Sequence, residues 1–156
     1  MKTASIQEIK QELQALSQSK LLDLCLRLAK FKKENKELLT YLLFEAHDEE
    51  AYIKTVKDLI DEGFTELPKA SLYLTKISLR RILRITARYI KYAGSKQVET
   101  ALLLHFCTKL NRSGIPYTKS PVLQNLYAMQ VKKAKAALLE LHEDLQYDFQ
   151  KELDAL

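Results

Sequence analysis

The chain has 156 residues, of which 47% are hydrophobic and 29% are charged, and its formal net charge is +5. This composition excludes an extended disordered chain, and the length fits a single domain over residues 1–156. The two cysteines, Cys25 and Cys107, lie far apart in the sequence, which excludes a disulfide framework and a Cys-x-x-Cys metal motif.

The first residues mix charges every few positions and lack the apolar core of a signal peptide. No apolar run approaches the ~20 residues that a membrane span requires. We therefore expect a cytoplasmic protein with no membrane partner and with both thiols reduced.

The N-terminal residues predict three short helices. Ser5 and Glu8 form a capping-box pattern at the start of the first, which is expected to end near Leu16. Ser19 is expected to cap the second helix and Asn35 the third. Together these segments predict a helical hairpin.

The following region, residues 36–62, reads either as one long helix or as two helices, and a break at Asp48 is the favoured interpretation. The chain has three glycines, Gly63, Gly94 and Gly114, and each is expected to mark a helix end. Phosphate loops, dinucleotide fingerprints and nucleophile elbows need clustered glycines, so these sites are excluded.

Two further helices are expected over residues 70–93 and 95–112, as a second hairpin. Segments 36–44 and 96–104 match at five of nine positions when the pair Leu38 and Val98 is counted as a match. Such an internal match would suit a short α-solenoid.

The last helix is expected to start at Ser120 and Pro121 and to run unbroken to Gln150, a length of about 45 Å. Its apolar residues follow heptad spacing, which permits packing along the domain or against another chain. Acidic residues would then crowd its C-terminal end, where the helix macrodipole disfavours them. We therefore expect a cationic neighbour for that acidic cluster.

Charge is distributed unevenly along the chain. Between Leu67 and Leu139 there are fourteen lysines and arginines and a single acid, Glu99, so this stretch carries about +13. Residues 1–66 carry −3 and residues 140–156 carry −5. A region of one sign attracts an anionic partner or pairs with acids of the same chain.

The cations of the 70–93 helix are expected on one face, about 140° wide, opposite its apolar residues. These candidate anion-binding or partner-binding residues are Lys76, Arg80, Arg81, Arg84, Arg88 and Lys91. Tyr92 and Tyr117 are added as aromatic contacts that we expect to be exposed. Two interpretations stay open: a binding face, or a solvated face that pairs with the chain's own acids. Whether the acidic C-terminal segment covers the face is also open.

The sequence predicts no catalytic residue, no metal site and no cofactor. The three histidines, His47, His105 and His142, occur without the spacing that places two ligands on one helix face. His105 is expected to be a partly buried structural residue. We therefore expect a protein that is not an enzyme.

These observations predict an all-α fold of six or seven helices in antiparallel hairpins, as a compact bundle or a short α-solenoid. The leading functional hypothesis is a non-enzymatic interaction module whose basic helix face binds an acidic protein surface or a second copy of the chain. The alternative is sequence-independent binding of nucleic acid through the same face.

Overall fold

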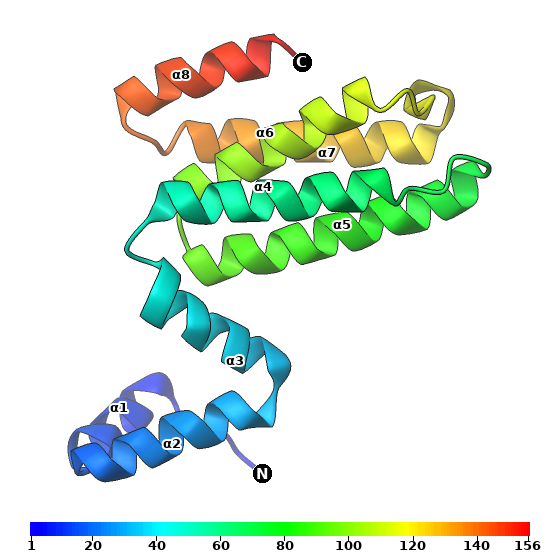
Figure 1. Cartoon of the computed structure of the whole chain (residues 1–156). Helices are drawn as coiled ribbons and strands as arrows, with labels where there is room; N and C mark the ends of the chain where they lie inside the picture. The colour runs from blue at the N-terminus through cyan, green and yellow to red at the C-terminus, as the bar shows by residue number, and fades with distance from the viewer. The chain divides into compact units, whose positions relative to one another are not determined.

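A computed structural model describes all 156 residues. The structure is helical throughout, with eight α-helices, one π-helical turn, one 3-10 turn and no strand (Figure 1). The all-α prediction is confirmed, whereas the expected number of six or seven helices is lower than the eight observed. Contacts divide the chain into an N-terminal unit, Met1–Phe44, and a C-terminal unit, Glu45–Leu156. A single domain over residues 1–156 stays a prediction.

The N-terminal unit is built from short helices: α1 (Ile6–Gln14), α2 (Gln18–Phe31) and α3 (Lys33–Thr40), followed by the π-helical turn η1 (Tyr41–Glu45). The capping box is confirmed, because the Ser5 side chain accepts from the Glu8 amide and Glu8 accepts from the Ser5 amide. Ser17, and not Ser19, caps α2. Asn35 lies inside α3 and its side-chain amide donates to the carbonyl of Leu28 at 2.8 Å, so its expected role as a cap was wrong.

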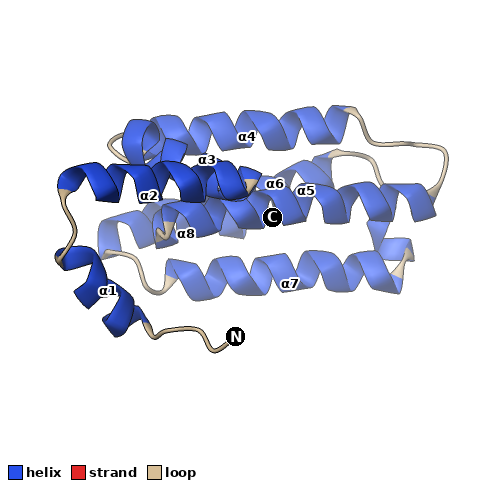
Figure 2. Cartoon of the chain, turned by 90° about the horizontal axis from the view of Figure 1, so that it is seen from below, coloured by secondary structure: helices blue, strands red, loops and turns tan.

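The C-terminal unit packs four helices around a fifth, α6. Its elements are α4 (Glu49–Thr65), α5 (Leu72–Ala93), α6 (Lys96–Arg112), the 3-10 turn η2 (Tyr117–Lys119), α7 (Pro121–Leu138) and α8 (Glu143–Asp154). Consecutive helices run in alternating directions, and α6 contacts α4, α5, α7 and α8 (Figures 1 and 2). The side chains of Leu102, Leu104, Phe106 and Cys107 in α6 are fully buried. The centre of the core of this unit therefore runs along α6.

Caps place most of the helix ends where the sequence indicates. Asp48 accepts from the Ala51 amide and starts α4, so residues 36–62 are broken as expected. Gly94 and Gly114 have φ values of 60° and 75°, the left-handed conformation that glycine adopts easily after a helix. Gly63 does not end a helix, because α4 continues through it to Thr65.

The role of Gly63 is close packing. A Cβ atom placed there would lie 2.8 Å from Cγ1 of the buried Ile82 in α5. Only a residue without a side chain allows this approach of α4 to α5.

The expected single helix from Pro121 to Gln150 is wrong. The chain turns after Leu138, and His142 starts α8 by accepting from the Asp144 amide through Nδ1 at 3.3 Å. Gln146 Nε2 fastens the turn by donating to the carbonyls of Leu139 and Leu141. The acids of this region consequently lie in the first turn of α8, where the macrodipole favours them.

The match between residues 36–44 and 96–104 does not correspond to equivalent elements. The first segment spans the end of α3 and η1, whereas the second lies within α6. It therefore gives no support to a solenoid repeat.

Candidate interaction face on α5

Helix α5 separates apolar and cationic residues on opposite sides. Ser71 caps its first turn and Gly94 ends it, and none of its 22 residues is acidic. Thr75, Leu79, Ile82 and Thr86 are buried. The hydroxyl of Thr86 is satisfied within the helix by donating to the Ile82 carbonyl at 2.9 Å.

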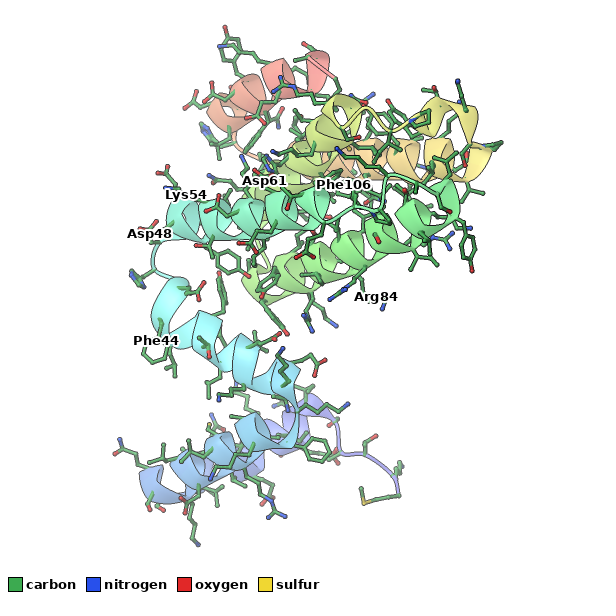
Figure 3. The ribbon with its side chains drawn as sticks, turned by 45° about the vertical axis from the view of Figure 1, so that its right-hand side comes forward. Phe44, Asp48, Lys54, Asp61, Arg84 and Phe106 are labelled. Carbon is green, nitrogen blue, oxygen red and sulfur yellow. The ribbon has the colours of Figure 1, made fainter.

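The predicted cations share the outward side of α5. We call this surface the α5 basic face; it consists of Lys76, Arg80, Arg81, Arg84, Arg88 and Lys91. Lys76 and Arg88 are half-buried, and the other four are exposed. Figure 3 shows Arg84 projecting away from the helices, while Phe106 lies among them.

Most of these cations have no acidic partner in the chain. No carboxylate lies within 4.0 Å of the charged groups of Arg80, Arg81, Arg84 or Lys91, whereas Arg88 is engaged within the chain. An internal salt-bridge belt along the whole face is therefore not present.

The acids of the C-terminal unit that form ion pairs do so away from the α5 basic face. Glu140 pairs with Lys96 at 3.3 Å, and Asp61 pairs with Lys109 at 3.0 Å. The acidic helix α8 packs on α6 and α7, on the side of this unit away from α5 (Figure 1). It does not cover the α5 basic face.

Two side chains that were not selected as site residues extend this face. Tyr73 is 65% exposed and Ile77 is 48% exposed, and they precede Arg80 and Arg84 by seven residues each, which places them on the same side of the helix. Lys76 Nζ lies 5.1 Å from the centre of the Tyr73 ring. Helical spacing alone places both residues on this face.

The two selected tyrosines are less available. Tyr92 is half-buried, and its ring lies edge-on to Tyr89 with centres 5.9 Å apart. Tyr117 is half-buried in η2, which packs on α7. Its hydroxyl donates to Asn111, and its ring centre lies 5.1 Å from that of Tyr127. The expected full exposure of both residues is therefore wrong, and their role as contacts stays a prediction.

A second polar cluster joins α4 to α6. Nε2 of His105 lies 2.6 Å from Oδ1 of Asp61, whose other oxygen binds Lys109. Burial raises the pKa of Asp61, but the hydrogen bonds and charge of His105 and Lys109 outweigh it, so the pKa lies below its ordinary value. His105 has no hydrogen bond to a hydroxyl or thiol. The cluster connects two helices.

Other chemistry-bearing groups are dispersed. No three histidine, cysteine, aspartate or glutamate side chains come together in a way that could hold a metal ion. Burial raises the pKa of the Cys107 thiol to about 12. None of the helices has the length and apolar character needed to cross a membrane.

Comparisons with models of protein families, with curated proteins and with solved structures give no match for this chain.

Proposed function

We propose that the chain is a non-enzymatic, cytoplasmic interaction module that binds an acidic protein segment through the α5 basic face. The observation that carries the proposal is the exposure of Arg80, Arg81 and Arg84 without an acidic partner in the chain. Guanidinium groups bind carboxylates through paired hydrogen bonds, so such a row is suited to an acidic partner.

Electrostatic repulsion along α5 also favours an anionic partner. Arg84 has like-charged neighbours at Arg80, Arg81 and Arg88, three or four residues away. Each such pair disfavours the helix by roughly 0.2–0.5 kcal/mol. Carboxylates bound between these arginines would replace the repulsion by attraction.

The apolar side chains on the same face favour a protein as the partner. Tyr73 and Ile77 offer uncharged contact area next to the arginines. Tyrosine and arginine are enriched in protein interfaces, where an apolar anchor supplies affinity and charge supplies selectivity. The expected partner is an acidic segment that carries at least one large apolar residue.

The test is binding of a fluorescein-labelled peptide rich in glutamate and aspartate, with one phenylalanine, followed by fluorescence anisotropy. Arg80→Glu with Arg84→Glu is expected to weaken binding by about tenfold or more. The matched control is Lys132→Glu with Lys133→Glu, which makes the same charge change on α7. Equal losses in the two variants, or no binding by the native chain, would overturn the proposal.

Nucleic acid is the second candidate, favoured by the combination of arginines with the exposed Tyr73 ring. Bases stack on exposed aromatic rings while cations contact the phosphates. A labelled single-stranded oligonucleotide in the same assay should then lose about five- to a hundredfold in affinity with Tyr73→Ala. Duplex binding through about five phosphates should weaken several-hundredfold between roughly 50 and 200 mM salt. Binding of oligonucleotide without binding of acidic peptide would put this candidate first.

A further inference from the structure

The acidic residues of the C-terminal unit are concentrated in α8. This helix has five acids against one lysine in 12 residues, which leaves a net charge of −4. Helix α4 also has five acids, but it has two lysines over 17 residues, and its Asp61 is held by Lys109 at 3.0 Å. Helix α8 therefore has the highest density of negative charge in this unit.

Helix α8 separates apolar and acidic residues on opposite sides. Phe149 and Leu153 pack against buried residues of α6 and α7. At a helical spacing of 100° per residue, the opposite side is about 140° wide and carries four acids, one tyrosine and one lysine, all of them exposed. We call this surface the α8 acidic face; it consists of Glu143, Asp144, Tyr147, Asp148, Lys151 and Asp154.

The α8 acidic face combines carboxylates with an apolar anchor. Tyr147 is 66% exposed, and its ring centre lies 4.1 Å from Nζ of Lys151. The side chain of Asp144 is 93% exposed. No ion pair involves Glu143 or Asp148. Carboxylates next to one large apolar residue are what the proposed function requires of a partner.

The surfaces on α5 and α8 match in length and are opposite in charge. The part of α5 from Tyr73 to Arg84 and the α8 acidic face from Glu143 to Asp154 each extend over 12 residues, about 18 Å of helix. Two copies of the α5 basic face repel each other, and so do two copies of the α8 acidic face. A contact through these surfaces therefore joins unlike faces.

The position of α8 prevents this contact within one chain. Figure 1 shows α8 at the top and α5 at the bottom of the C-terminal unit, with α4, α6 and α7 between them. The α8 acidic face also points away from α6 and α7, because the opposite side of α8 packs on these helices. The two faces can therefore meet only between two copies of the chain.

We propose that the α5 basic face of one copy binds the α8 acidic face of another copy, in a head-to-tail contact. This inference rests on the proposed function and names its partner. Each contact leaves one α5 basic face and one α8 acidic face unoccupied, so further copies add until a ring closes or an open chain forms. One helix against one helix is a small interface, and we expect a Kd on the order of 10–50 µM.

The first test is the weight-average mass in solution, measured by sedimentation equilibrium at about 5 and about 100 µM chain in about 50 mM salt. The single chain has a mass of 18.1 kDa. We expect the mass of the native protein to be at least about twofold higher at the higher concentration. Salt at about 500 mM should remove this difference, because it screens exposed charges.

Two variants each remove one of the faces. Arg80→Glu with Arg84→Glu reverses charge on α5, and Asp148→Lys with Asp154→Lys reverses it on α8 without altering the acids of the first turn. Each variant alone should have the same mass at both concentrations. An equal mixture of the two should associate, because each supplies the face that the other lacks.

Matched controls make the same charge changes at other exposed positions. Lys132→Glu with Lys133→Glu on α7 is the control for the α5 variant. Asp58→Lys with Glu62→Lys on α4 is the control for the α8 variant. Both controls should associate as the native chain does, and circular dichroism should show the same helix content in all four variants.

The second test needs no variant. Helix α8 buries no residue, so its backbone amides are expected to exchange readily with solvent deuterium. Binding of α8 by another copy should slow this exchange by roughly two- to tenfold between about 5 and about 100 µM chain. The amides of α7, which lies outside the proposed contact, should exchange at the same rate at both concentrations.

Three results would overturn the inference: a native mass that does not rise with concentration, reversal variants that associate as the native chain does, or a mixture of the two variants that stays at the mass of its components. Binding of the labelled acidic peptide by a native chain that does not associate would overturn this inference and leave the proposed function in place. Absence of both peptide binding and association would overturn both. Asp148→Lys with Asp154→Lys should still bind the peptide, because its α5 basic face is intact.

Discussion

Replacing Gly63 by alanine tests how closely α4 and α5 pack. At an open position inside a helix, this change stabilises a protein by up to about 1 kcal/mol, because alanine has the higher helix propensity. At Gly63 the new Cβ would lie 2.8 Å from Cγ1 and 3.0 Å from Cδ1 of Ile82. Cγ1 sits next to the Ile82 backbone and cannot swing away cheaply. Overpacking of a core costs typically about 1–3 kcal/mol, so we expect a net destabilisation of about 1 kcal/mol.

The assay is urea unfolding followed by circular dichroism, for Gly63→Ala, Ile82→Ala and the double variant. Ile82→Ala alone should cost about 2–5 kcal/mol by leaving a cavity. The double variant should be at least about 1 kcal/mol more stable than the sum of the single effects, because the shortened side chain at position 82 leaves room for the added methyl group. A Gly63→Ala variant that is more stable than the native chain, or effects that simply add, would refute the close approach.

Three further outcomes follow from single contacts. Asp61→Asn should lower the free energy of unfolding by up to about 1 kcal/mol at pH 7. The partners of Asp61, including His105, hold its pKa in the folded chain below the ordinary value. The difference in free energy of unfolding between the variant and the native chain should therefore shrink as the pH falls below about 4. A thiol reagent at pH 8 should modify Cys25 in the native chain and reach Cys107 only on unfolding, since Cys107 is fully buried and has a pKa of about 12; rapid loss of both thiols would contradict the burial. His142→Ala should cost about 0.5–2 kcal/mol in urea unfolding by removing the cap of α8, and His142→Ser should restore most of it, whereas equal stabilities of all three chains would argue against the cap.

The parts of the fold that sequence reasoning predicts correctly depend on local contacts. The Ser5 and Asp48 caps each involve a side chain and an amide three residues apart, so these helix starts can be recognised in the sequence without the rest of the chain. The cationic side of α5 is likewise a matter of helical spacing. Gly63 was misread because its role depends on Ile82, nineteen residues away and on another helix.

The break before α8 was missed for a different reason. No glycine or proline lies between Leu138 and Glu143, and the residues there are ordinary helix formers. The chain turns because of a cap at His142 and side-chain bonds from Gln146, neither of which is a common signal. In the candidate face, exposure was expected of Tyr92 and not of Tyr73, because the exposure of a tyrosine depends on which helices lie beside it.

The central position of α6 has a consequence for how the C-terminal unit opens. The backbone amides of α6 are covered by α4, α5, α7 and α8. They can therefore exchange with solvent deuterium only when several of these helices separate together. Helix α8 buries no residue and is in contact with α6 and α7. It can detach while the rest stays folded, and its amides should exchange first. The unit therefore has a graded stability, lowest at the acidic C-terminal helix and highest along the α6 axis.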